Sequence, residues 1–324
     1  MALRIAFCGT PAFAVPSLEY LLRKPEFQVA GVVTQPDRPR GRGQEVHSSP
    51  VKDAAVAAGI PVYQPEKIKS EEAYEYFKRL TPDAVVIIAY GQIISPRLIK
   101  IPRLGWINLH ASLLPKYRGA APINWAIVNG ETRTGVTTMQ IDTGLDTGPT
   151  LLTHETEIAP EETAPALAAR LAVAGAPLVA ETLRKLDRRE ISPKPQDNSQ
   201  ASLARPLKKE DGRIDWSLSA HRICNRIRGF DPWPGAYTAF RGKRCDIWGK
   251  AASEAQLGAG FKLAPAADAT APGAIFVRND EIFVVCGAGT FLRLEFVRLE
   301  GRKRVTAAEF ANGARLAHDE SFGS

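Results

Sequence analysis

The apolar positions in the first half of the chain fall into short, nearly continuous runs separated by stretches with helical spacing. These runs, several of them bounded by Gly or Pro, occur at 3–8, 29–33, 83–89, 106–109 and 136–141. Residues between them, such as 15–22, place apolar side chains at helical intervals. Apolar strands that alternate with helices are typical of a parallel sheet covered on both faces. The pattern therefore predicts an open α/β domain with a mostly parallel sheet.

The pattern changes towards the C-terminus. Residues 163–189 form the longest helical stretch, and 190–206, rich in Pro, Ser, Asn and Lys, is interpreted as a linker. A helical stretch at 216–230 follows. Short strands without intervening helices come next, at 236–240, 245–248, 274–277, 282–286 and 291–297. We expect one domain at 1–189, the linker, and a small β-barrel domain at 207–324.

The net charge of the chain indicates the kind of partner it binds. The formal net charge of the 324 residues is +7 and the isoelectric point is near 9.3, which favours an anionic partner. Residues 205–324 carry 19 Lys and Arg against 14 Asp and Glu, whereas residues 1–204 carry 23 against 21. The excess lies mainly in the C-terminal third, where Arg302, Lys303 and Arg304 fall in a predicted turn between strands. Charge alone leaves a solvated basic surface open as the alternative.

Several classes of protein are disfavoured by the composition. No apolar run approaches the roughly 20 residues of a membrane helix, and the N-terminal run is too short for a signal peptide. We therefore expect a cytoplasmic protein with no membrane partner. The four Cys residues lack metal-ligand spacing, so we expect reduced, mostly buried thiols and no metal site. No Gly-x-Gly-x-x-Gly fingerprint follows the first strand, which disfavours dinucleotide chemistry. A monomer is the default expectation.

Polar side chains cluster where two predicted strands end. Asn108 and His110 are two residues apart, so their side chains point to the same face of a strand, and Asp146 follows the next strand in a glycine-rich loop. Ligands of open α/β sheets bind beyond the carboxyl ends of strands. An Asn amide can stabilise a developing oxyanion, a His can transfer protons near neutral pH, and a carboxylate can orient an imidazole. The trio suits acyl transfer to an amine. A polar pair without chemistry is the alternative.

Residues 34–49 form a second segment of interest because they are basic, rich in glycine and without a strand or helix pattern. The segment contains Arg38 and Arg42, and Arg42 has Gly on both sides. Loops of this length are often functional, and a Gly-flanked Arg can approach a backbone closely and contact phosphate. The alternative is a solvated surface loop.

Residues 105–122 together with 135–148 resemble the folate-dependent formyltransferase family. Shorter matching motifs extend the resemblance over nearly the whole chain, at 5–11, 34–39, 41–43, 49–52, 118–123, 214–216 and 232–234. The resemblance implies a Rossmann-like sheet domain, 10-formyltetrahydrofolate as one-carbon donor, and Asn108, His110 and Asp146 as the catalytic trio. The residues that match its folate site are Ser112, Leu113, Leu114, Pro115, Tyr90 and Gly91.

Within this family the chain is most similar to the tRNA-specific members, whose small barrel we expect to be OB-like. The acceptor implied is the amine of methionine on initiator tRNA, contacted by Arg38, Arg42 and residues 302–304 of this chain. Residues 45–47 lack the added positive charge often found there in the family, which weakens any assignment for 44–48.

Two other functions remain open at this point. One is a relative that formylates a small amine, such as a nucleotide sugar or a purine precursor, and the basic features argue against it. The other is a non-catalytic RNA-binding protein, and the intact trio argues against that.

Overall fold

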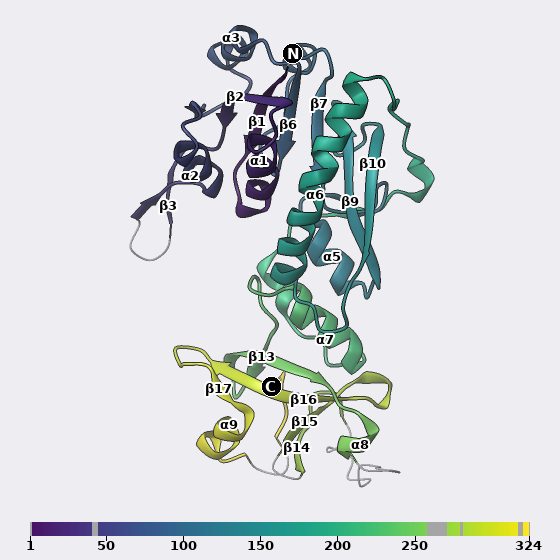
Figure 1. The fold of residues 1–324 in the computed structure, drawn as a ribbon. Coiled ribbons are helices and arrows are strands. Elements are labelled where there is room, and N and C mark those ends of the chain that lie inside the picture. The colour runs from purple at the N-terminus through teal and green to yellow at the C-terminus, as the bar shows by residue number, and fades with distance from the viewer. Residues whose placement is uncertain (1, 41–44, 258–270, 279–280, 317–319, 324) are drawn as a thin grey trace. The chain divides into compact units, whose positions relative to one another are not determined.

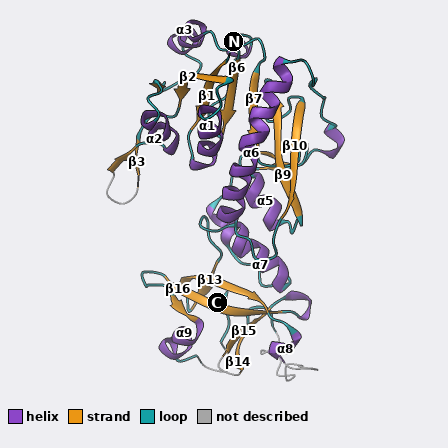
Figure 2. Ribbon diagram, viewed as in Figure 1, coloured by secondary structure: helices purple, strands orange, loops and turns teal. Residues whose placement is uncertain are grey.

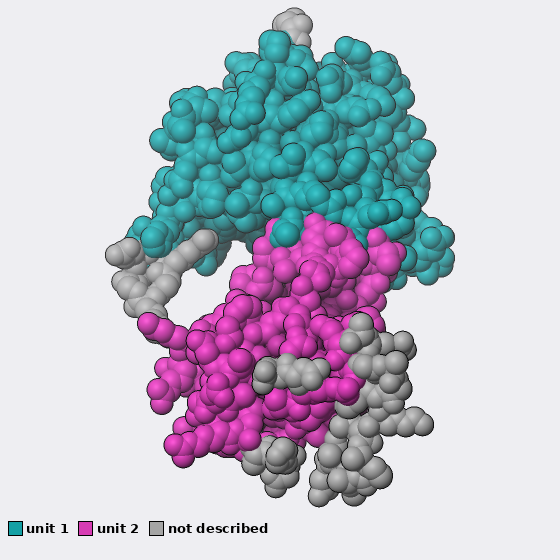
Figure 3. Space-filling view, turned by 60° about the horizontal axis from the view of Figure 1, so that its bottom comes forward, with its two compact units in different colours: residues 1–122, 133–158, 166–205 teal, residues 123–132, 159–165, 206–324 magenta. Residues whose placement is uncertain are grey.

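The chain forms two compact units in a computed structural model that describes residues 2–40, 45–257, 271–278, 281–316 and 320–323. Unit 1 comprises residues 1–122, 133–158 and 166–205, and unit 2 comprises residues 123–132, 159–165 and 206–324 (Figure 3). Residues 190–205, which are all but the last residue of the 190–206 segment interpreted from the sequence as a linker, therefore pack within unit 1. Their short strand β11 (Leu203–Ala204) pairs in parallel with β8 (Arg118–Gly119).

Unit 1 is built on a seven-stranded sheet with the order β10-β9-β7-β6-β1-β2-β5 (Figures 1 and 2). Its strands are β1 (Leu3–Gly9), β2 (Phe27–Val33), β5 (Val62–Tyr63), β6 (Ala84–Ile88), β7 (Trp106–His110), β9 (Arg133–Gln140) and β10 (Thr150–Glu157). Strands β5, β2, β1, β6 and β7 run parallel to one another. Strand β9 pairs antiparallel with β7, and β10 pairs antiparallel with β9. The predicted mostly parallel, Rossmann-like domain is confirmed. The pattern missed β10, an edge strand with mainly polar exposed residues, and the two-residue β5.

Helices flank this sheet. They are α1 (Val15–Leu22), α2 (Pro50–Ala57), α3 (Glu71–Leu80), α4 (Pro96–Ile99) and α6 (Ala164–Asp187), with 3-10 turns at Ala12–Ala14 and Asn198–Gln200. Helices α2, α3 and α4 each begin after a serine whose hydroxyl accepts a backbone N–H, the N-cap arrangement. Helix α6 is long and apolar enough to span a membrane by length and composition, but 56% of its most apolar stretch is buried inside the protein.

The central strand β7 presents different residues to its two faces. Leu109 faces α6 and packs closely against Gly175 of that helix. A Cβ added at Gly175 would lie only 2.4 Å from the Leu109 side chain, so the close packing requires glycine. Trp106 faces the other way, against Phe77 of α3, with ring centroids 5.1 Å apart. Asn108 follows Trp106 by two residues and His110 by four, so both polar residues continue the Trp106 face beyond its apolar core.

Unit 2 contains an antiparallel sheet with the order β12-β13-β16-β15-β14, and β17 pairs with β16. The strands are β12 (Tyr237–Phe240), β13 (Lys243–Ala251), β14 (Ile275–Arg278), β15 (Glu281–Val285), β16 (Phe291–Leu299) and β17 (Val305–Thr306). The helices are α5 (Pro122–Val128), α7 (Ala220–Gly229), α8 (Glu254–Leu257) and α9 (Ala307–Ala314), with 3-10 turns at Lys209–Gly212 and Gly287–Gly289. Five of these strands were predicted. Helix α7 begins later than predicted because the Asp215 carboxylate binds the N–H and hydroxyl of Ser217 in a separate turn.

The basic segment 34–49 was predicted to lack secondary structure, and this was wrong. Strands β3 (Arg38–Arg40) and β4 (Glu45–His47) form an antiparallel hairpin. Such short polar strands carry no apolar alternation, which is why the pattern missed them. Arg42, between them, lies outside the described residues.

All four cysteines are free, and three of them, Cys8, Cys245 and Cys286, are buried, as predicted. Burial raises the pKa of Cys8 well above its ordinary value, that of Cys245 and Cys286 to about 12, and that of Cys224 to about 11. Among the described residues, no group of three or more His, Cys, Asp or Glu side chains could hold a metal ion.

Candidate active site

Strand β7 ends in two polar side chains that are almost fully buried, Asn108 at 9% exposed and His110 at 6%. The strand is paired on both sides: Asn108 lies between Ile87 and Met139, and His110 is opposite Thr137. The Asn108 amide makes no hydrogen bond with any other residue that the structure describes. Because buried polar groups are normally hydrogen-bonded, this amide is available to a ligand.

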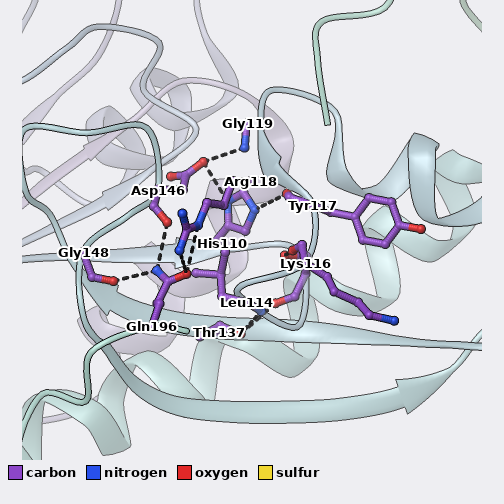
Figure 4. Close-up of polar contacts among 11 residues, drawn as sticks. His110, Leu114, Lys116, Tyr117, Arg118, Gly119, Thr137, Asp146, Gly148 and Gln196 are labelled. Atoms are coloured by element: carbon purple, nitrogen blue, oxygen red, sulfur yellow. Dashed lines mark hydrogen bonds and ion pairs between the residues drawn. The ribbon is translucent and has the colours of Figure 1, made fainter. Parts of the chain in front are cut away.

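Both ring nitrogens of His110 face oxygen atoms (Figure 4). The Nε2 atom lies 2.8 Å from the carbonyl oxygen of Tyr117, and Nδ1 lies 3.5 Å from Oδ2 of Asp146. A carbonyl can only accept, so the proton on Nε2 is assigned from this partner. A second proton on the ring would then face a carboxylate, which stabilises the imidazolium that forms when His110 takes up a proton.

An unusual stretch of backbone, residues 117–119, carries partners for both His110 and Asp146. Tyr117 has φ of +60° and its carbonyl accepts from His110, while the Gly119 N–H donates to Asp146 Oδ2 at 2.8 Å. Gly119 has φ of +117°, and a Cβ there would lie 2.7 Å from the Ala204 carbonyl oxygen. Only glycine meets both demands. Tyr117 and Gly119 lie in a stretch that matches the family, but these backbone roles are not visible in the sequence, because the stretch is held by pairing with residues 85 positions away.

Asp146 is also in the left-handed region, with φ of +52°. Its side chain is 15% exposed, so the carboxylate is largely shielded from water in the site. The structure thus brings together the three residues predicted to be catalytic, from the end of β7 and from the loop between β9 and β10.

The predicted folate loop is shaped by its own hydrogen bonds. The fully buried Ser112 donates its hydroxyl to the Lys116 carbonyl at 2.6 Å, so this hydroxyl is occupied within the loop. Thr137, on the neighbouring strand β9, donates to the Ser112 carbonyl at 2.7 Å and accepts from the Leu114 N–H at 3.3 Å. The Leu114–Pro115 peptide is cis. Leu113, Leu114 and Pro115 are partly exposed.

A cavity of about 670 Å³ opens at the ends of β1, β2 and β6. Tyr90, Gly91 and Arg38 are among its lining residues, and residues 112–115 are not, although the sequence predicted one pocket lined by both segments. The Tyr90 ring is buried in the core, and burial raises the pKa of its hydroxyl. The Tyr90 carbonyl accepts from Thr10 at 3.3 Å and from Gln35 at 3.0 Å, so what Tyr90 and Gly91 offer the cavity is mainly backbone.

The basic residues predicted to contact nucleic acid are divided between the two units. Arg38 is exposed in β3 of unit 1. Arg302, Lys303 and Arg304 are exposed in the turn between β16 and β17 of unit 2, as predicted. The Arg304 guanidinium stacks over the rings of Trp248 and Phe296, 4.3 Å and 4.0 Å from their centroids.

Known proteins match this chain over nearly its whole length. Residues 3–183 match the formyl transferase family, and residues 206–315 match the formyl transferase C-terminal domain. A protein of Solibacter usitatus named methionyl-tRNA formyltransferase is 54% identical over 321 residues, which cover 99% of each chain. One of the same name from Geobacter metallireducens is 47% identical over 315 residues, which cover 97% of this chain and 96% of the relative.

Solved structures share the fold at lower identity. An N-formyltransferase from Helicobacter canadensis, in complex with folinic acid and dTDP-3-aminofucose, has a TM-score of 0.63 at 20% identity. It covers 90% of this chain and 98% of its own. HypX from Aquifex aeolicus, in complex with tetrahydrofolic acid, has a TM-score of 0.62 at 16% identity and covers 96% of this chain and 47% of its own.

Proposed function

The chain belongs to the methionyl-tRNA formyltransferase family, and on that premise we propose that Asn108, His110 and Asp146 are its catalytic residues. The enzyme transfers the formyl group of 10-formyltetrahydrofolate to the amino group of methionyl initiator tRNA. The products are tetrahydrofolate and N-formylmethionyl-tRNA for translation initiation. One observation supports the residue assignment above all: an uncommitted Asn108 amide lies two residues from a His whose two nitrogens face oxygens.

The proposed reaction begins when the methionyl nitrogen attacks the formyl carbon and a new C–N bond forms. Negative charge develops on the formyl oxygen, and the Asn108 amide donates a hydrogen bond to it. His110 takes the proton that the amine loses onto Nδ1, the ring nitrogen that carries none, and the Tyr117 carbonyl and the Asp146 carboxylate stabilise the imidazolium. The bond from the formyl carbon to N10 of the folate then breaks as His110 returns the proton to N10. The catalytic groups end as they began.

The folate donor is proposed to bind in unit 1 between the cavity at Tyr90 and Gly91 and the loop of residues 112–115. The cavity volume of about 670 Å³ suits a drug-sized ligand. The loop supports the proposal through its rigidity, since Thr137 and Ser112 hold its backbone. The chemistry assigned to the trio needs no metal, and we expect none.

The tRNA is proposed to contact Arg38 in β3, Arg42, and residues 302–304 in unit 2. Exposed cations bind phosphates without reading sequence. Stacking on two rings holds Arg304 ready for such a contact. We also propose that the unit 2 sheet is an OB-like barrel, and that the protein is a cytoplasmic monomer with no membrane partner. Several short antiparallel strands support the barrel.

An assay with 10-formyltetrahydrofolate tests this function. We expect formylmethionyl-tRNA from charged initiator tRNA, and no formylation of free methionine, an amino sugar nucleotide or a ribonucleotide amine. Equal turnover of a small amine would support an enzyme for small acceptors. Folate and tRNA binding without any turnover would support a non-catalytic RNA-binding protein.

A further inference from the structure

Gln196, from the segment that follows α6, reaches the loop that carries Asp146 (Figure 4). Its Nε2 donates to the carbonyl oxygen of Asp146 at 2.9 Å and to that of Gly148 at 2.6 Å. A single side-chain amide therefore holds two positions of the turn, although it lies about 50 residues away in the sequence.

The other end of the Gln196 amide is fixed as well. Its Oε1 accepts from Nε and from one terminal nitrogen of Arg118, at 3.0 Å and 2.8 Å. Arg118 is only 6% exposed, and its terminal nitrogen also donates to Asn198 Oδ1 at 2.9 Å. A guanidinium only donates and a carbonyl only accepts, so one orientation of the amide satisfies every partner. The buried cation thus locks the direction in which Gln196 points its N–H groups.

The hydrogen bonds from Gln196 act on Asp146, whose backbone conformation needs support. Asp146 has φ of +52°, and non-glycine residues in that region persist where the surroundings hold them. Its carboxylate is 2.8 Å from the Gly119 nitrogen and 3.5 Å from His110 Nδ1. Gly119 directly follows Arg118. Gly119 therefore holds the Asp146 side chain directly, and Arg118 holds the Asp146 main chain through Gln196.

We propose that Gln196 is a positioning residue for formyl transfer, which sets the Asp146 carboxylate against His110 and is itself oriented by Arg118. The proposal rests on the catalytic role proposed above for Asp146. It gives residues 190–205, which the sequence indicated as part of a linker at 190–206, a part in the active site.

The diagnostic variant is Gln196→Glu. Its carboxylate still accepts from Arg118, with added charge attraction, but an oxygen replaces the nitrogen that faces the two carbonyl groups. A misplacement of about 1 Å costs about 100-fold in rate, so we expect kcat to fall by about 30- to 100-fold. KM for folate and for charged tRNA should stay within about threefold, because only the interaction formed in the transition state weakens. The thermal unfolding midpoint should remain close to that of the unchanged protein.

Gln200→Glu is the matched control. It makes the same chemical change in the same segment, at an exposed side chain that donates to Asp197 and contacts neither Arg118 nor the Asp146 loop. Its kcat should be unchanged. If Gln196→Glu fails to fold, Gln196→Met, which keeps the length of the side chain and removes its polar atoms, should show the same loss of kcat.

Asp146→Asn distinguishes the catalytic role proposed for Asp146 from the positioning role proposed for Gln196. If Asp146→Asn has normal kcat, the catalytic assignment of Asp146 is overturned. If Asp146→Asn is slow while folded Gln196→Glu and Gln196→Met are normal, only the positioning role is overturned. The double variant Gln196→Glu/Asp146→Asn should be no more than about threefold slower than Asp146→Asn alone, because coupled residues are not additive. Full additivity, or a rise in KM alone, would also overturn the positioning role.

Discussion

Replacing Gly119 with Ala tests whether the backbone of residues 117–119 maintains the catalytic geometry. A Cβ at Gly119 would lie 2.7 Å from the Ala204 carbonyl oxygen, and φ of +117° is strained for alanine. Either β8 separates from β11 or residue 119 rotates, and in both cases the N–H that reaches Asp146 at 2.8 Å is displaced.

The magnitude follows from these contacts. The backbone strain costs about 1–2 kcal/mol, and a displaced hydrogen bond to a charged group costs about 1.5–3 kcal/mol. Together these come to about 2.5–5 kcal/mol, which lowers the unfolding midpoint by roughly 5–20 °C. Because the Asp146 carboxylate loses its anchor, we expect kcat for formylation to fall by about 100-fold as well.

Gly59→Ala is the control for this experiment. Gly59 also has positive φ, +69°, but a Cβ there has nothing within 4 Å. It should lose only the roughly 1–2 kcal/mol that a left-handed backbone costs a residue with a Cβ, and it should keep its kcat. Thermal unfolding and initial formylation rates at saturating folate and tRNA measure both variants. Equal midpoints for the two variants, with a normal kcat for Gly119→Ala, would show that the backbone of residues 117–119 does not maintain the catalytic geometry.

Other substitutions and treatments test separate parts of the proposal. Asn108→Ala should lower kcat by about 100- to 1,000-fold with little change in the unfolding midpoint, since its amide bonds no other described residue; unchanged turnover would remove it from the site. Burial raises the pKa of all four cysteine thiols, so they stay protonated at pH 8 and iodoacetamide should label them only after unfolding; rapid labelling of the native enzyme would contradict this. Changing residues 302–304 to Ala should weaken binding of all tRNAs alike and reduce its salt dependence; an unchanged salt slope in filter binding would exclude them. Arg42→Ala should lower kcat and initiator selectivity at saturating tRNA with folate binding intact; normal values would show that Arg42 has no part in recognising the tRNA.

The sequence was sufficient for the parts of the fold and site that depend on local pattern. Strands buried on both faces are continuous apolar runs, so β1, β6 and β7 could be located before the structure. The spacing of Asn108 and His110 placed them on one face of β7, and the glycines around Asp146 indicated a turn. Residues 302–304 were predicted to lie in a turn after the apolar run at 291–297, and the structure places them between β16 and the two-residue β17.

Contacts between residues distant in the sequence could not be predicted. Strands β8 and β11 have two residues each, too few for any periodicity, and they join positions about 80 residues apart. Gln196 resembled a polar linker residue because nothing near it in the sequence shows that Arg118 and Asp146 are its partners. Ser112 resembled a ligand-binding hydroxyl, but the structure uses that hydroxyl to close its own loop.

The rate of formyl transfer in His110→Ala shows directly whether His110 is the proton-transfer group of this site. A single turnover is measured with 10-formyltetrahydrofolate and charged initiator tRNA both saturating, and binding of each is measured separately on the same protein. With His110 as the proton-transfer group, the rate should fall by about 100-fold or more, with both affinities and the fold retained. A rate within a few-fold of the unchanged enzyme would contradict the assignment of this site.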